Sequence, residues 1–189
     1  MTTAIETGQD VITFLELQHR QIKQLFGEVR ASSGEQRERT FTELRRLLAI
    51  HETAEEEVVH PAARKALPGG DAIINARLQE ENKAKKALSA LEELDPNSPE
   101  FDAQFSTFAM DVLAHAAAEE RQEFEPLAAS LSEAELERLR HTVELAERFA
   151  PTRPHPGVES QAANLVVGPF AAMVDRARDL LTGKNSTNP

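Results

Sequence analysis

The sequence predicts an all-α protein: an up-down-up-down four-helix bundle with a fifth helix and a short C-terminal tail helix. Apolar residues recur at the three- and four-residue spacing of amphipathic helices through most of residues 1–150. Helix-capping residues and turns rich in proline and glycine divide this pattern into long segments with short connections. A His-x-x-x-Glu motif also occurs twice, so the chain contains an internal repeat of two helix pairs.

Composition limits the possible functions. A length of 189 residues fits one domain of roughly 150 residues with a short appendage. The absence of cysteine excludes disulfides, Fe–S clusters and thiolate-bound metals, and it suits a reducing cytoplasm. A net charge of −11 argues against nucleic-acid binding, which depends on Lys and Arg. No signal peptide or membrane span is expected, because the N-terminus lacks a basic region and the longest apolar stretch, 165–174, is short.

The first helix is expected to start at Asp10, a good N-cap residue, and to run to about Ala31. His19 lies on its apolar stripe, where a polar ring must be paired or ligated because burying it alone is costly. The other residues of this stripe are Val11, Phe14, Leu15, Ile22, Leu25, Phe26 and Val29.

The second helix is expected after a Ser-Ser-Gly break, with Ser33 and Gln36 forming its capping box. It carries His51 and Glu55, and Pro61 is expected to end or kink it. The apolar residues predicted on the same face are Phe41, Leu44, Leu47, Leu48 and Val58.

The third helix is expected to follow the turn at 67–70, with Asp71 as its N-cap, and to stop at 95–99. Its predicted stripe contains one polar residue among apolar ones: Ile74, Leu78, Asn82, Leu88 and Leu91.

Ser98 as N-cap and Pro99 at the first helical position are expected to open the fourth helix. Ser132 and Glu135 form a second capping box, which opens an extra helix at 133–149. The stripe of the fourth helix ends in ligand-type residues: Phe101, Phe105, Phe108, Val112, His115, Glu119 and, less regularly, Glu123.

We therefore expect residues 1–150 to form the bundle and residues 151–189 to form a Pro-rich linker and a short amphipathic helix. His141 and His155 are expected to lie away from any site. Because the tail offers no plausible ligand, a chain ending at Ala150 is expected to keep its metal. The C-terminal helix is a candidate surface for a protein partner.

Two motifs predict a metal site in the bundle core. His51 and Glu55 lie four residues apart, as do His115 and Glu119, so each pair shares one helix face. With His19, these residues place three histidines and two carboxylates from three helices in one core. Buried carboxylates must be protonated or paired, and a cation with nitrogen and oxygen ligands would pair them.

The three histidines, the two His-x-x-x-Glu motifs and the glutamate and proline that follow each motif resemble the hemerythrin-like HHE cation-binding family over roughly residues 10–130. The Pro-rich tail also resembles the tails of actinobacterial members. The resemblance implies a four-helix bundle with a non-haem di-iron centre. It further implies a role in binding or sensing O2 or NO, in iron handling, or in peroxide decomposition. The implied ligands are three terminal histidines and two bridging glutamates: His19, His51, His115, Glu55 and Glu119.

Asn82 departs from this family pattern, because it stands where the family usually has a further histidine, and an amide oxygen is a poor ligand for iron. Glu52, Glu81 or His60 could complete the second metal position instead. His60 follows His51 by nine residues, about half a turn round an ideal helix, so it is expected to point away. If the gap stays open, one metal is expected to be labile, and Asn82→His is expected to raise metal content.

Two classes of function remain. The first is a non-haem iron protein that binds a small diatomic or turns over peroxide at an open coordination position. No catalytic triad or Gly-rich phosphate loop is visible, so any catalysis would come from the metal. The second is a metal-poor regulatory or interaction module with a degenerate site. Iron storage is less favoured, because nothing in the sequence suggests a shell. The sequence leaves O2, NO and peroxide, and iron and manganese, undistinguished.

Overall fold

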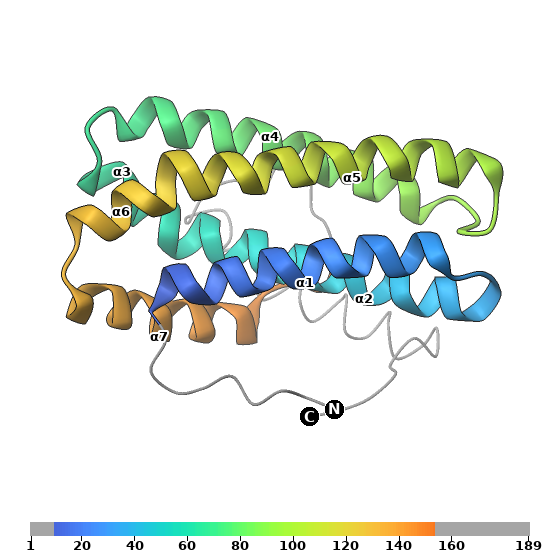
Figure 1. Cartoon of the computed structure of the whole chain (residues 1–189), viewed down its shortest axis with the longest axis horizontal. Helices are drawn as coiled ribbons and strands as arrows, with labels where there is room; N and C mark the ends of the chain where they lie inside the picture. The colour runs from blue at the N-terminus through green and yellow to red at the C-terminus, as the bar shows by residue number, and fades with distance from the viewer. Residues whose placement is uncertain (1–9, 154–189) are drawn as a thin grey trace.

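The computed structural model describes residues 10–153, and these residues form the predicted all-α bundle (Figure 1). Consecutive long helices run in opposite directions, as the sequence predicts. The predicted tail helix and His155 lie outside the described residues. The four long helices are α1 (Val11–Ala31), α2 (Gly34–Ala54), α4 (Gly70–Glu92) and α5 (Pro99–Glu119).

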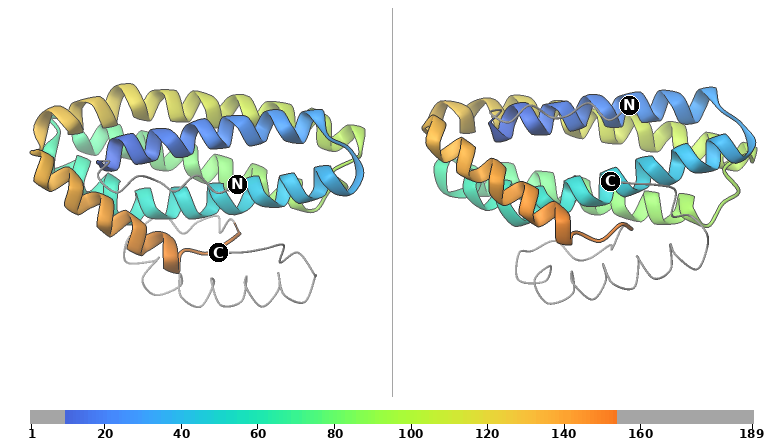
Figure 2. Two further views of the ribbon diagram at one scale, coloured as in Figure 1. Left: turned by 60° about the horizontal axis from the view of Figure 1, so that its bottom comes forward. Right: turned by 90° about the horizontal axis from the view of Figure 1, so that it is seen from below.

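Two of these helices are extended by a π-helical turn and a short α-helix. The extensions are η1 (Glu55–Val59) with α3 (His60–Ala66) after α2, and η2 (Glu120–Phe124) with α6 (Glu125–Ser130) after α5. The predicted fifth helix, α7 (Glu133–Phe149), lies obliquely against α1, α2 and η1 (Figure 2).

Three helix starts follow the predicted capping chemistry. The Asp10 carboxylate accepts a hydrogen bond from the backbone N–H of Thr13 at 2.8 Å, and the Ser98 hydroxyl accepts one from Phe101 at 3.1 Å. Ser132 and Glu135 form the predicted capping box at the start of α7. These caps satisfy backbone donors that have no partner inside their helices.

The capping box predicted at Ser33 is wrong. Ser33 occupies the N-cap position of α2, but its side chain makes no capping hydrogen bond. The following glycine, Gly34, has a left-handed backbone with a φ of 58°, and its N–H donates to Asn97 Oδ1 at 2.6 Å. The cap is therefore supplied by the α4–α5 loop, because the left-handed glycine turns the first N–H toward that loop.

The sequence predicts Asp71 as the N-cap of α4, but Asp71 lies in the first turn of this helix. The N-cap is Gly69, two residues earlier, with a φ of 73°, and the helix starts at Gly70. A Cβ atom on Gly70 would lie 2.8 Å from the Arg64 carbonyl oxygen, so only glycine allows α3 and α4 to approach this closely. The Asp71 carboxylate instead accepts a hydrogen bond from Arg64 at 2.9 Å.

Pro61 does not end its helix, which continues to Ala66. A π turn lies directly before Pro61, and the same arrangement occurs before the first turn of α6. The wider turn leaves room for a proline ring that would clash with a carbonyl of an α-helix. Each π turn adds one residue, which rotates the side chains beyond it by about 100°. The bonds that close the π turns run from the N–H of one residue to the carbonyl five residues back, from His60 to Glu55 and from Glu125 to Glu120.

The apolar core is divided into two clusters along the bundle. The cluster near the α1–α2 and α4–α5 loops is built round five packed aromatic rings: Phe26, Phe41, Phe101, Phe105 and Phe108. The other cluster, which α7 covers, includes Leu15, Val59, Ile74, Phe124 and Val143. On α1, His19 falls between Leu15 of one cluster and Ile22 of the other. A polar band therefore lies between two apolar layers.

The chain stays in contact with the bundle just beyond α7. Ala150 and Thr152 are buried, and Arg153 forms an ion pair with Glu92 of α4. The domain boundary at residue 150 and the dispensability of residues 151–189 remain predictions. A chain ending at Arg153 tests whether residues 154–189 are dispensable while keeping this ion pair. Within residues 10–153, no helix is long and apolar enough to cross a membrane.

Candidate metal centre

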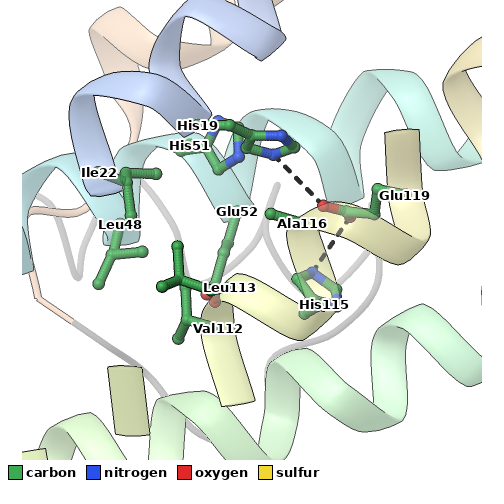
Figure 3. A pocket seen from close by; sticks show the side chains of 10 residues that line it. All are labelled: His19, Ile22, Leu48, His51, Glu52, Val112, Leu113, His115, Ala116 and Glu119. Carbon is green, nitrogen blue, oxygen red and sulfur yellow. Dashed lines mark ion pairs between the residues drawn. The ribbon is translucent and has the colours of Figure 1, made fainter. Parts of the chain in front are cut away.

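The structure brings the five predicted ligand side chains together in the polar band. The Glu119 carboxylate lies between His19 and His115, as Figure 3 shows. Its oxygens are 3.4 Å from His19 Nε2 and 3.1 Å from His115 Nε2. His51 Nε2 lies 3.3 Å from a carboxylate oxygen of Glu55, and both glutamates are completely buried. Four polar groups from three helices thus converge round Glu119.

The three histidines share one orientation. In each ring the Nδ1 atom contacts a polar side chain, and the Nε2 atom faces a buried carboxylate. A histidine whose Nδ1–H is hydrogen-bonded keeps the lone pair of Nε2 for a metal, and such partners are usual round metal ligands. The Nδ1 contacts are His19 with Glu120 at 2.9 Å, His51 with Gln18 at 2.7 Å, and His115 with Glu80 at 2.9 Å.

Three further residues extend the band beyond the predicted five. Glu81 and Glu123 are completely buried, and His60 is 2% exposed. His60 Nδ1 lies 2.9 Å from Glu123 Oε1, and His60 Nε2 lies 2.5 Å from Glu81 Oε1. The sequence suggested Glu81 as one candidate to complete the site and placed Glu123 less regularly on the stripe of the fourth helix.

The expectation that His60 points away from the core is wrong, and the π turn explains why. On an ideal helix, nine residues place His60 about 180° from His51. The extra residue in η1 makes His60 equivalent to an eighth position, about 80° from His51, so its ring enters the core. The acidic run before Pro61 carries no periodic signal for this rotation, so the apolar pattern could not reveal it.

Asn82 is not the inward residue of α4, although its Oδ1 atom is buried. It is partly exposed and lines a groove on the outer side of α4 with Gln79, Lys83 and Lys86. The preceding residue, Glu81, occupies the inward position instead. The predicted stripe through Asn82 was therefore one residue out of phase in this part of α4. The buried residues of the helix are Gly70, Ile74, Arg77, Glu81, Ala84, Lys85, Leu88 and Leu91.

The inward side chains form three groups that could each hold a cation, with ligand atoms within 4.8 Å of one another. Glu119 belongs to all three groups, so its carboxylate is the shared centre of the cluster. The groups are His19, His51, Glu55 and Glu119; His60, Glu119 and Glu123; and Glu81, His115 and Glu119.

Unpaired atoms in this cluster support a cation. Both carboxylate oxygens of Glu55 and of Glu119 are buried without a hydrogen-bond partner among residues 10–153. The same is true of Nε2 in His19 and His115, and of one oxygen each in Glu81 and Glu123. These atoms lie in ion-pair contacts, but leaving so many of them without a hydrogen bond in one core is costly. Nitrogen and oxygen donors in this mixture suit a divalent transition metal such as iron or manganese, so the residues fit a metal centre.

Burial and neighbouring histidines shift the pKa values of the acidic groups in opposite directions. Burial raises the pKa of Glu52 and Glu56 to about 8, although the Lys85 ammonium lies beside Glu56, and it raises that of Glu55 well above its usual range. Burial alone would also raise the pKa of Glu119, but His115 and His19 hold it well below the usual value. The cluster therefore contains both protonated and ionised carboxyl groups near neutral pH.

Burial also lowers the pKa of His51 to about 3, so this imidazole is neutral at physiological pH and its Nε2 atom can bind a metal. The pKa of His115 is instead raised well above its usual value, because Glu119 and Glu80 outweigh the effect of burial. A cation at Glu119 would compete with the proton on His115, so binding is expected to release protons.

A small cavity of about 10 Å³ adjoins the cluster (Figure 3). This volume is close to the space that one water molecule needs. One wall is polar and the other is apolar. The lining residues are His19, His51, Glu52, His115 and Glu119 on the polar side, with Ile22, Leu48, Val112, Leu113 and Ala116 completing the wall.

Comparison with known proteins agrees with this arrangement. Residues 10–128 match the family described as Hemerythrin HHE cation binding domain. The structure is similar to the crystal structure of a hemerythrin HHE cation-binding domain-containing protein from Mycobacterium kansasii. The TM-score is 0.67 at 21% sequence identity, and the match covers 90% of this chain and 98% of that one. At this identity the likeness supports the fold.

The sequence is also similar to a DNA nickase of Nostoc sp. strain PCC 7120, at 29% identity over 130 residues. That match covers 68% of this chain but 36% of the nickase, so this chain spans little more than a third of the relative it matches.

Proposed function

This chain belongs to the hemerythrin HHE cation-binding domain family, and on that premise we propose that its bundle core holds a non-haem di-iron centre for a small diatomic molecule or peroxide. The observation that carries the proposal is the convergence on Glu119 of nitrogen and oxygen atoms that lack hydrogen-bond partners. The residues that would hold the metal are three histidines and two glutamates: His19, His51, His115, Glu55 and Glu119.

The protein side chains have distinct tasks in this proposal. Bound iron would supply the redox chemistry and an open coordination position. Gln18, Glu80 and Glu120 orient the three imidazoles through their Nδ1 atoms. The cavity beside the cluster has room for about one water-sized molecule, which suits a diatomic or peroxide. Glu52, whose pKa is raised to about 8 by burial, places a protonated carboxyl at this cavity and can donate a hydrogen bond there.

We do not extend DNA cleavage from the nickase to this chain. The net charge of −11 disfavours contact with a phosphate backbone, and the match leaves most of the nickase uncovered.

Replacing His51 or His115 by alanine tests the metal site. Either change is expected to remove most of the iron that wild-type protein retains, because each removes an imidazole aimed at a buried carboxylate. Helical circular dichroism is expected to persist, since two apolar clusters flank the site. Iron is measured by elemental analysis and by absorption. The chain contains no Trp or Tyr, so ferric bands are expected to stand out and tyrosinate bands to be absent.

His141, whose side chain is 72% exposed, provides the control, and His141→Ala is expected to keep wild-type iron. Wild-type iron content in both His51→Ala and His115→Ala would contradict the proposal. Wild-type protein that folds normally but retains no metal would favour the alternative, a regulatory or interaction module with a degenerate site.

Gln18 provides a second test, because it links α7 to the ligand His51. Its Oε1 accepts from His51 Nδ1, and its Nε2 donates to Glu147 Oε1 at 2.6 Å. Gln18→Leu is expected to weaken Fe(II) binding roughly 10- to 100-fold, since the imidazole loses the partner that orients it. Competition with a chelator measures the affinity. Gln24→Leu, on the exposed side of α1, is expected to leave it unchanged, and equal affinities in the two variants would exclude this role for Gln18.

A further inference from the structure

We propose that His60 binds the second metal of this centre, together with Glu81, His115 and Glu119, and so supplies the imidazole that α4 lacks. This inference rests on the proposed function, because it assigns ligands within the same metal centre. It places a ligand on α3, outside both His-x-x-x-Glu motifs.

His60 has the same orientation as the three histidines already described. Its Nδ1 atom contacts a carboxylate, Glu123 Oε1, at 2.9 Å. Its Nε2 atom faces the interior of the cluster and lies 2.5 Å from Glu81 Oε1. A carboxylate that holds Nδ1 while Nε2 faces the metal is the usual arrangement round a histidine ligand. Glu123 thus stands to His60 as Glu80 stands to His115.

The position on α4 that breaks the repeat cannot supply this ligand. Asn82 lines the groove with Gln79 and Lys83, about 100° round α4 from Glu81. The helix contributes Glu81 to the core, and one oxygen of Glu81 lacks a hydrogen-bond partner among the described residues. α4 therefore offers a carboxylate, and an imidazole must come from another helix. The π turn η1 rotates His60 into the core at this place.

Two of the candidate cation groups adjoin one another. Glu81 and His115 form a group with Glu119, and His60 forms another with Glu119. The 2.5 Å contact between His60 and Glu81 joins them. The combined set has two imidazole nitrogens and two carboxylates, a mixture that suits iron or manganese. Its partner set is His19, His51, Glu55 and the shared Glu119.

A purely structural ion pair explains less. A protonated His60 would balance the charge of Glu81, and burial raises the pKa of Glu123, so charge alone does not require a cation in this buried triad. Each of the two glutamates also keeps one buried oxygen without a hydrogen-bond partner in residues 10–153. A cation next to His60 would bind the buried Glu81 oxygen that has no hydrogen bond of good geometry, which the ion pair with His60 leaves unsatisfied.

The test titrates full-length protein, stripped of metal, with Co(II) and follows the visible absorption and the bound metal per chain. Wild-type protein is expected to bind two equivalents. His60→Ala is expected to bind one, because the set of His19, His51 and Glu55 is unchanged. His141→Ala, the exposed control, is expected to bind two. Asn82→His is also expected to bind two with unchanged affinity, because position 82 faces the groove.

Glu123→Gln provides a second measurement if His60→Ala loses its helical circular dichroism. It is expected to weaken the second equivalent by at least about 10-fold and to leave the first unchanged, since His60 loses the carboxylate that orients it. If His60→Ala folds and binds two equivalents with wild-type affinity, His60 is not a ligand, and the proposed function still stands. If His60→Ala does not fold, the same result in Glu123→Gln has the same meaning. A single equivalent in wild-type protein would also overturn the role of His60 and leave the proposed function standing. No metal in wild-type protein would overturn both.

Discussion

Glu119→Gln is expected to remove most of the metal from both positions, the largest loss of any single change in the cluster. Glu119 belongs to every candidate cation group, and neither of its oxygens has a hydrogen-bond partner among the described residues. Glutamine keeps the size of the side chain but replaces an anionic oxygen by an NH2 group, which donates hydrogen bonds and cannot bind a cation. Without the shared carboxylate, each cation would lose an anionic ligand, so both positions are expected to bind metal weakly.

Elemental analysis of the purified variant, with circular dichroism to verify folding, measures this effect. Glu125→Gln makes the same chemical change at an exposed position on α6 and is expected to retain wild-type metal. Two metals per chain in Glu119→Gln would show that Glu119 is not the shared ligand. One metal per chain would show that it serves a single position.

Protein stripped of metal is expected to lose stability as the pH rises from about 6.5 to about 8. Burial raises the pKa of Glu52 and Glu56 to about 8 from an ordinary value of 4.5, so the folded protein keeps protons that the unfolded chain has released. Whenever the folded state binds more protons, the free energy of unfolding falls with rising pH. The stabilisation is complete below pH 4.5 and is lost through about pH 8.

Histidines in the cluster add to this effect within the same window. Burial would lower the pKa of His60 and His115, but their carboxylate neighbours raise it well above 6.5, so these rings also lose stabilising protons as the pH rises. His51 has the opposite sign, because burial lowers its pKa to about 3. The contribution of His51 to the free energy of unfolding rises with pH only between about 3 and 6.5. This range lies below pH 6.5–8, so His51 does not offset the loss of stability there.

Thermal unfolding with excess chelator, at several pH values between 6.5 and 8, measures this dependence. Metal-loaded protein is expected to show a smaller fall or a rise, since the cation replaces the protons that the cluster would otherwise lose. Glu52→Gln is expected to flatten the curve of the stripped protein. A melting temperature that is constant or increases with pH in stripped wild-type protein would contradict the expectation.

The sequence predicts the bundle well because its signals are local and repeated. Asp10, Ser98 and Ser132 cap their helices through bonds to residues three positions away, and such bonds depend little on the rest of the fold. His19 and His115 follow apolar residues at helical spacing, so their inward direction was readable. Their burial beside Glu119 confirms that reading of direction, whereas their role as ligands remains a proposal.

Features that depend on tertiary context were not predictable. The cap at Gly34 comes from Asn97, which is far away in sequence. Whether Glu81 or Asn82 faces the core depends on a rotation of α4 by about 100°. The apolar residues Ile74 and Leu78 are compatible with either rotation, so the sequence pattern does not decide between them. The position of His60 depends on a hydrogen bond to the carbonyl five residues back, and no side-chain pattern encodes that bond.

The paired π turns also suggest how such a centre can change during evolution. A single inserted residue redirects every side chain beyond it and leaves every side chain before it in place. An inserted residue can thus change which side chain beyond it points into the core, while the motif before it stays in place. In one half of this protein His60, just after η1, faces the carboxylates. In the other half Phe124, nine residues after His115 and at the end of η2, stacks on His19 with ring centroids 5.5 Å apart. The two halves of the repeat thus place different rings at corresponding positions, nine residues after each motif histidine: a ligand candidate in one and a packing residue in the other.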